Sequence, residues 1–160
     1  MVSLAAIAFF APGCALVTHG LHQSVEITSM PAGATAVVDD HEAGRTPLTV
    51  SLTRADSHRI ELRKPGFAPG RQELTPEFQD YAQRKIRFGV DIDSGAANVL
   101  KPETVTVELM PEMLALAAAG DAFEQMSAAV LAADDLWHRS VISESDHRYM
   151  IAKILAHFSP

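Results

Sequence analysis

Basic side chains are scarce in this chain. Thirteen Lys and Arg stand against twenty Asp and Glu over 160 residues, which gives a formal net charge of -7 at pH 7. A nucleic-acid surface needs a basic stripe that neutralises phosphates, and the cations here are scattered among the acids, so no nucleic-acid partner is expected. At 48% hydrophobic and 21% charged residues, the composition is that of a globular chain with one modest core.

Signatures of covalent and catalytic chemistry are also missing. A single cysteine, Cys14, cannot form an internal disulfide. The sequence contains no Gly-x-Ser-x-Gly, no Cys-His pair and no Gly-rich phosphate loop, which are the motifs that position a nucleophile, its base or a phosphate. We therefore expect no enzymatic activity and no cofactor.

The N-terminal segment, residues 1–20, carries no charged side chain. Its apolar run, residues 4–10, is too short to span a bilayer but has the length of the apolar region of a signal peptide. We predict a signal peptide over residues 1–13, whose cleavage leaves Cys14 as the first residue of a linker over residues 14–24. No Lys or Arg precedes the apolar run, so we expect the start codon to lie farther upstream. The alternative is a buried N-terminal helix that contains a free cysteine.

Residues 25–74 consist of short β-branched runs separated by Pro and Gly. Apolar and polar side chains alternate within the runs, which is the period of a strand with one buried face. Strands are expected over residues 25–29, 35–38, 48–52 and 57–64, with Val25, Ile27, Leu48, Val50, Leu52, Ile60 and Leu62 facing inward. Because Pro fixes φ and Gly adopts positive φ at low cost, the chain is expected to turn where these residues recur. The turn positions are Pro31, Gly33, Gly44, Pro47 and Gly66.

The order and spacing of these turns resemble a known module. The pieces are Pro31-Ala32-Gly33-Ala34, Val38-Asp39-Asp40, Gly44-Arg45-Thr46-Pro47-Leu48, His58 and Lys64-Pro65-Gly66-Phe67. At these separations they are similar to the PEGA domain, a small β-sandwich module of bacterial envelope proteins. The resemblance implies a β-sandwich over this stretch, and for His58 a role in packing or in a backbone hydrogen bond.

The residues around Cys14 carry a second resemblance. Ala11 and Gly13 ahead of Cys14 resemble the lipobox of bacterial lipoproteins, and the residues that follow resemble the start of PEGA-type lipoproteins. The resemblance implies lipidation of Cys14, with diacylglycerol and a third, amide-linked acyl chain that hold the protein at a membrane without a transmembrane helix. Ala15 stands where Asp would signal retention in the inner membrane. The resemblance therefore implies the outer membrane, with the protein facing the periplasm.

The chain beyond the resembling module is predicted to extend the sandwich. Residues 75–85 are polar and are predicted to form one or two helical turns, with Pro76 at the first helical position. Residues 86–96 alternate apolar and polar side chains, and residues 104–109 form a final strand. Its inward residues are Val105, Val107 and Leu109. This segment resembles the one that follows the PEGA module in the same lipoproteins, so the sandwich with its extension is expected to cover residues 25–110.

Residues 111–160 are predicted to be helical. Pro111 suits a helix start, and an Ala- and Leu-rich run follows to Ala119. Asp121 is expected to cap a second helix, and residues 143–146 match a capping-box start for a third. The predicted apolar stripes are Phe123, Met126, Val130, Ala133 and Trp137 in the second helix, and His147, Met150, Ile151, Ile154, Leu155 and Phe158 in the third. These stripes predict an antiparallel hairpin that packs on itself, on the sandwich or on a partner.

Together these patterns predict an α+β protein, in which a signal peptide precedes a small antiparallel β-sandwich and a C-terminal helical hairpin. One side-chain cluster invites a metal hypothesis, because Asp134, Asp135 and His138 fall within one helical turn. No second His pair with ligand spacing accompanies them, and a His near a helix C-terminus is favoured by the helix dipole alone. We expect no metal site there. His41, among the acids of residues 39–42, is interpreted as part of a solvated turn.

The leading hypothesis is a lipid-anchored, non-enzymatic protein of the cell envelope. Its β-module would bind or support an envelope protein or a glycan, and its membrane contact would be the lipid on Cys14. The alternative is an accessory subunit of an envelope assembly that docks through its C-terminal helices. A metal protein that uses Asp134, Asp135 and His138 is the third hypothesis.

Overall fold

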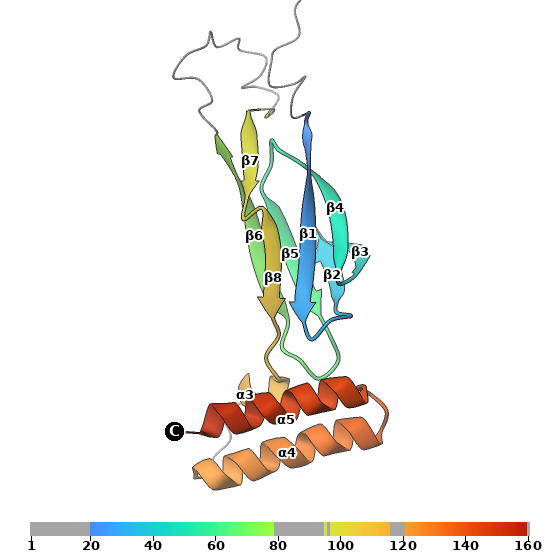
Figure 1. Ribbon diagram of the computed structural model, residues 1–160, viewed down its shortest axis with the longest axis vertical. Helices are drawn as coiled ribbons and strands as arrows, with labels where there is room; N and C mark the ends of the chain where they lie inside the picture. The colour runs from blue at the N-terminus through green and yellow to red at the C-terminus, as the bar shows by residue number, and fades with distance from the viewer. Residues whose placement is uncertain (1–19, 79–94, 96, 116–120, 160) are drawn as a thin grey trace, which may run out of the picture.

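Two β-sheets stack face to face, and a pair of helices closes one end of the stack (Figure 1). The computed structural model describes residues 20–78, 95, 97–115 and 121–159. In chain order the elements are β1 (His22–Met30), β2 (Thr35–Val38), β3 (His41–Arg45), β4 (Leu48–Thr53), β5 (His58–Arg63), β6 (Gly70–Phe78), β7 (Asn98–Lys101), β8 (Thr104–Glu108), α3 (Glu112–Ala115), α4 (Ala122–His138) and α5 (Glu144–Phe158). The predicted α+β class, a small β-sandwich followed by a helical hairpin, is confirmed.

The smaller sheet has the strand order β4-β1-β8. β1 pairs antiparallel with β4, where Val25 lies opposite Val50, and parallel with β8, where Ile27 lies opposite Val105. Because side chains alternate between the two faces of a strand, Val25 and Ile27 share the inner face, and both are fully buried. The inward positions predicted for β1 are therefore confirmed.

The larger sheet has the order β3-β2-β5-β6-β7, and each neighbouring pair is antiparallel. Ala36 lies opposite Leu62, and both side chains are fully buried. The buried apolar residues of the two sheets form one cluster: Val25, Ile27, Ala34, Ala36, Val38, Leu52, Ile60, Leu62, Phe67, Leu74, Leu100, Val105 and Leu109. Removing this apolar surface from water is the main stabilising contribution to the sandwich.

The turn that we expected at Gly44 lies instead at Asp39-Asp40. Both residues have positive φ, 48° and 66°, a conformation that Asp tolerates better than most side chains, and β3 follows at once. Gly44 lies inside β3, where the pairing register with β2 shifts, and its φ of 138° fits a β-bulge. The sequence pattern missed β3 because this edge strand is polar, as edge strands often are.

The helical turns predicted from residue 75 are wrong for the described part of that segment. β6 continues to Phe78 and pairs with β7, so that Pro76 lies opposite Leu100. Pairing with β7, which the sequence pattern did not predict, overrides the weak helix signal of a lone Pro at a first-turn position. Residues 79–85 lie outside the described residues, as does the predicted alternating segment 86–96 apart from Gly95.

Both predicted helix caps are confirmed. The Asp121 side chain accepts a hydrogen bond from the backbone N–H of Glu124 at the start of α4. The Ser143 side chain accepts one from the backbone N–H of Asp146 at the start of α5. α4 and α5 then run antiparallel beneath the sandwich (Figure 1).

The apolar stripe predicted for α4 is wrong at both ends. Phe123 is 71% exposed and Trp137 is 40% exposed, whereas Ala129 and Ala133 are the buried residues of the helix. In α5 the buried apolar residues are Met150 and Ile154, and Leu155 is 47% exposed. The buried face of α4 is therefore narrower and richer in alanine than the sequence pattern indicated.

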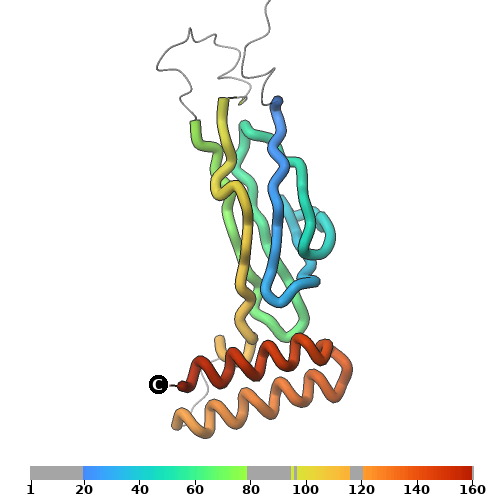
Figure 2. The backbone as a smooth tube through the Cα atoms, viewed as in Figure 1, coloured from blue at the N-terminus to red at the C-terminus, as the bar shows by residue number. Residues whose placement is uncertain are grey.

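The two ends of the molecule differ in what they carry. β1 begins at the end far from the helices, and β6 ends and β7 begins at that same end (Figure 2). The β5–β6 loop and the helices lie at the opposite end, which we call the base. Among the described helices, none combines the length and the apolar composition needed to cross a membrane.

Candidate binding surface at the base of the sandwich

The β5–β6 loop, residues 64–69, joins the sandwich to the helices. Gly66 in this loop has a φ of 80°, and a Cβ placed on it would lie 2.6 Å from Met150 Cε and 3.0 Å from Leu136 Cδ1. Phe67 is 5% exposed, and its ring centroid lies 6.0 Å from that of Tyr149. The loop backbone is therefore packed directly against α4 and α5.

A buried ion pair fastens the same loop. Lys64 Nζ lies 3.2 Å from Asp146 Oδ2 of α5, and the two side chains are 11% and 10% exposed. Lys64 Nζ also donates a hydrogen bond of 2.8 Å to the backbone oxygen of Ala32, in the β1–β2 turn. One ammonium group therefore links a sandwich turn, the β5–β6 loop and α5.

A third contact between sandwich and helices lies at the end of β8. Tyr149 of α5 donates a hydrogen bond of 3.1 Å to Glu108, and Lys153 forms an ion pair with the same carboxylate. The hydrogen bonds from Lys153 and Tyr149 and the charge of Lys153 lower the pKa of Glu108 below its ordinary value. Burial and the hydrogen bond to Glu108 raise the pKa of Tyr149 to about 12. The helix pair is thus held by polar contacts on two sides of the base.

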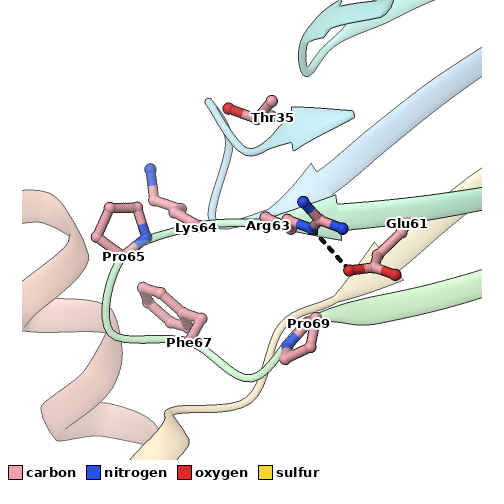
Figure 3. A pocket seen from close by; sticks show the side chains of 7 residues that line it. All are labelled: Thr35, Glu61, Arg63, Lys64, Pro65, Phe67 and Pro69. Atoms are coloured by element: carbon pink, nitrogen blue, oxygen red, sulfur yellow. Dashed lines mark hydrogen bonds and ion pairs between the residues drawn. The ribbon is translucent and has the colours of Figure 1, made fainter. Parts of the chain in front are cut away.

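A cavity of about 480 Å³ opens beside the β5–β6 loop (Figure 3). It is lined by Thr35, Glu61, Arg63, Lys64, Pro65, Phe67 and Pro69. Figure 3 shows the two prolines and the phenylalanine on the loop, and Glu61 and Arg63 on the neighbouring strand. The cavity therefore offers an apolar wall next to charged groups.

One carboxylate holds two arginines at the edge of this cavity. Arg63 Nε lies 2.7 Å from Glu61 Oε1, and Arg71 Nε lies 3.2 Å from Glu61 Oε2. Hydrogen bonds from Arg63 and Arg71, together with their charges, lower the pKa of Glu61 below its ordinary value, so the group is ionised at neutral pH. Both arginines are largely exposed, at 62% and 66% of the side chain, whereas Glu61 is 18% exposed.

A third arginine belongs to the same face of the sheet. Thr35 pairs with Arg45 on one side and with Arg63 on the other. Directly opposite residues of antiparallel strands point to the same side of a sheet, so Arg45, Thr35 and Arg63 form one row on the outer face. Arg45 is exposed, and its side chain makes no hydrogen bond or ion pair within the part of the chain that the structure describes. We call Arg45, Arg63 and Arg71 the arginine patch.

His58 lies at the other end of β5 and is bound on both sides of its ring. Nδ1 is 2.6 Å from Asp39 Oδ2, and Nε2 is 3.0 Å from the backbone oxygen of Thr53. Burial lowers the pKa of His58, but the hydrogen bonds to Asp39 and Thr53 and the charges of Asp39 and Asp56 outweigh burial and raise it. Since both ring nitrogens face oxygen acceptors, the protonated ring satisfies both contacts. The predicted backbone hydrogen bond of His58 is confirmed, and its carboxylate partner was not predicted.

The pair formed by His58 and Asp39 makes a pH-dependent contribution to stability. The pKa of His58 is raised above 6.5, so the contribution is complete below about pH 6.5 and is lost as pH rises through the raised pKa. Burial raises the pKa of Asp39, but the hydrogen bonds from His58 and Arg59 outweigh burial and the net pKa is below 3.8. Its contribution is therefore present above about pH 3.8 and is lost as pH falls through the lowered pKa.

We expect Asp39→Asn to destabilise the protein more at about pH 5.5 than at about pH 8.5, because the charged pair exists only at the lower pH. The measurement is urea unfolding at both pH values. Asp40→Asn is the matched control, since Asp40 is the exposed neighbour in the same turn and makes no bond to His58. An Asp39→Asn loss that is equal at the two pH values would contradict the charged pair.

Four of the turn residues predicted from the sequence lie in loops between strands, and the fifth, Gly44, lies inside β3. Pro31 and Gly33 lie between β1 and β2, Gly33 has a φ of 82°, and its N–H bonds the backbone oxygen of Thr46 at 2.9 Å. Pro47 lies between β3 and β4, and Gly66 lies in the β5–β6 loop. These positions shape the backbone, and Gly66 lies against Met150 and Leu136 of the helices at the base. Cys14 lies outside the described residues.

The structure pairs the residues of the metal hypothesis differently. Asp134 Oδ1 lies 2.6 Å from His147 Nε2 of α5, and Asp135 lies 3.1 Å from Arg139. The ring of Trp137 stacks on that of His147 at 5.0 Å between centroids. Within the described parts of the chain, no group of three or more His, Cys, Asp or Glu side chains is placed to hold a metal ion.

The sequence pattern did not identify the arginine patch or the Lys64 and Asp146 pair. Alternation along β5 indicated that Arg63 faces solvent, but only the strand register places Arg45 and Arg71 beside it. Lys64 and Asp146 lie about half the length of the chain apart in the sequence. No local signal in the sequence connects them.

Comparison with known proteins agrees with the fold. The family model described as PEGA domain matches residues 22–89. No curated protein and no solved structure matches the chain. The matched stretch begins at the first residue of β1 and contains β1 to β6, the arginine patch and the β5–β6 loop. The sandwich part of this chain is thus similar to the PEGA domain family.

Proposed function

We propose that this protein is a lipid-anchored component of a bacterial cell envelope, and that its β-module is a non-enzymatic binding or structural unit. The observation that carries the proposal is a PEGA-like module that begins at His22, shortly after a charge-free leader and Cys14. Acyl chains on Cys14 would hold the protein at a membrane, since two or more chains anchor stably where one chain binds only marginally.

The arrangement of the fold suits a tether at this position. Residues 15–21 separate Cys14 from β1 and reach at most roughly 24 Å when extended. β1 starts at the end of the sandwich opposite the helices, and its nine residues span roughly 30 Å. A membrane attachment at Cys14 would therefore present the base, with the cavity and the helix pair, away from the bilayer.

The compartment follows from the same proposal. Ala15 after the cysteine favours the outer membrane over the inner one, with the protein facing the periplasm. The partner would be an envelope protein or a glycan at the base. Docking of the helices onto a larger envelope assembly is the second candidate function, because Phe123 and Leu131 of α4 leave apolar side chains 71% and 68% exposed.

Cys14→Ala is expected to abolish labelling of the protein by an alkyne-bearing palmitate in growing bacterial cells, because the thioether that carries the lipid cannot form. The protein should then leave the membrane fraction or keep its leader, which mass measurement of the purified chain distinguishes. Ser51→Ala, a small change at an exposed strand position, is the control and should label like the parent chain. Undiminished labelling of Cys14→Ala would disprove the anchor.

A further inference from the structure

The arginine patch contains guanidinium groups whose N–H donors are only partly hydrogen-bonded within the described residues. Arg63 and Arg71 each bond Glu61 through Nε, so their terminal Nη1 and Nη2 groups have no partner in any contact among the described residues. Arg45 has no bonding partner there at all. Planar guanidinium groups with free terminal N–H donors match the geometry of carboxylate and phosphate oxygens.

The local charge of the patch is opposite to that of the chain. Glu61 pairs with two of the three arginines, Arg63 and Arg71, and Arg45 is unpaired among the described residues, on a protein whose formal net charge is -7. Thr35 adds a hydroxyl in the middle of the row between Arg45 and Arg63. An anion approaching this face would be attracted by the arginines, although the chain as a whole carries a net negative charge.

The cavity beside the arginine patch has an apolar wall, which an apolar group of a ligand would contact. Pro65, Phe67 and Pro69 form its loop wall, and Arg63 and Glu61 form its strand wall. Its volume of about 480 Å³ lies within the usual range for ligand pockets, in which apolar walls are combined with a few fixed polar groups. A ligand that fills it would carry an apolar group next to its anionic group.

We propose that the arginine patch and the adjoining cavity bind an acidic segment of a partner protein, with a carboxylate on the arginines and a neighbouring apolar side chain in the cavity. This names the partner chemistry of the binding module proposed above and rests on that proposal. An anionic membrane surface fits less well, because two carboxylates lie on the same sheet face as the patch. Glu42 lies opposite Val37 and Glu73 lies opposite Arg59, and anionic lipids would repel both.

The test is an NMR titration of the isotope-labelled full chain with the peptide acetyl-Phe-Glu-Glu-Phe-amide. We expect shifts confined to the arginine patch, Thr35, Glu61 and the β5–β6 loop, and weaker binding at higher salt. The neutral peptide acetyl-Phe-Gln-Gln-Phe-amide should bind about tenfold more weakly, since it lacks the charge-assisted hydrogen bonds. Equal binding of the two peptides, or shifts elsewhere on the protein, would overturn the proposal.

Variants of the patch separate its role from that of folding. Arg45→Gln and Arg63→Gln should each weaken peptide binding by about tenfold, and Arg45→Gln removes no contact within the described fold. Arg59→Gln is the matched control, because Arg59 is an exposed cation on the same face of β5, opposite Glu73 and away from the cavity. An equal loss for Arg59→Gln would show a general charge effect and refute the site.

Two further probes distinguish other sources of the anion. Inorganic phosphate at the same concentration should shift the arginine patch less than the acidic peptide does, because it cannot fill the apolar wall. Vesicles of equal parts phosphatidylglycerol and phosphatidylethanolamine should not bind through Arg45 and Arg63, and binding through them would replace the peptide proposal with a membrane one. Labelling at Cys14 is independent of both probes, so failure of the anchor and failure of this site are distinguishable.

Discussion

Asp146→Ala is expected to lower the free energy of unfolding by about 3 kcal/mol or more, because it leaves the Lys64 ammonium buried without its counter-charge. The two side chains are 11% and 10% exposed, so water replaces the lost partner poorly. Lys64 keeps only its hydrogen bond to the backbone oxygen of Ala32. Urea unfolding, followed by circular dichroism and by the fluorescence of Trp137, the only tryptophan of the chain, measures the loss.

A second ion pair on the helix hairpin provides the control. Asp135 and Arg139 lie 3.1 Å apart but are 61% and 66% exposed, so Asp135→Ala should cost less than about 0.5 kcal/mol. Replacing both buried partners, as Lys64→Met with Asp146→Leu, should recover much of the Asp146→Ala loss, since no charge is then left buried. If Asp146→Ala costs no more than Asp135→Ala, water reaches the pair and it does not fasten the helices.

The sandwich could be predicted from the sequence where its strands alternate clearly. β1, β4, β5 and β8 each place apolar residues on one face with a period of two, and Pro or Gly marks the turns that follow β1, precede β4 and follow β5. The helix starts were equally predictable, because Asp121 and Ser143 act through bonds to residues three positions ahead. These are all short-range signals.

The elements that escaped prediction depend on partners distant in the sequence. β3 is a polar edge strand, and the end of β6 is held as a strand by β7, which lies on the far side of a long connection. The stripe of α4 failed for a similar reason. Phe123 and Trp137 continue the helical spacing, yet the buried residues of the helix are Ala129 and Ala133, and its Leu136 lies beside Gly66 of the sandwich.

The candidate site could not be predicted from the sequence either, because its side chains come from residues that are distant in the sequence. Arg45, Arg63 and Arg71 come from three strands, and they become neighbours only through the registers of β2 with β3, of β2 with β5 and of β5 with β6. A shift of one residue in any of these pairings would turn the arginines to different faces. Register thus decides the chemistry of the surface, whereas composition alone indicates an acidic protein.

The β5–β6 loop serves both the cavity and the helices. Pro65, Phe67 and Pro69 face the cavity, while Gly66 between them touches α4 and α5. A change in how the helices sit on Gly66 would therefore move the wall of the candidate binding site. This coupling makes Gly66 the position at which helix docking and ligand binding are tested together.

Gly66→Ala is expected to destabilise the protein by about 3 kcal/mol. About 1 to 2 kcal/mol comes from placing an L side chain at a φ of 80°. The rest comes from overpacking, because the new Cβ would lie 2.6 Å from Met150 Cε and 3.0 Å from Leu136 Cδ1. Met150 is fully buried, so the tip of its side chain has little space into which to move. Urea unfolding measures the loss.

Gly33→Ala separates the two causes. Gly33 has nearly the same φ, 82°, but a Cβ there would meet only Lys64 Nζ, at an ordinary contact distance of 3.5 Å. It should therefore show the backbone cost without the overpacking, and Gly66→Ala should exceed it by about 1 to 2 kcal/mol. Only Gly66→Ala should also change the fluorescence of Trp137 in the folded state, because only it displaces the helix pair. Equal losses for the two variants would mean that the helices are not seated on this loop in solution.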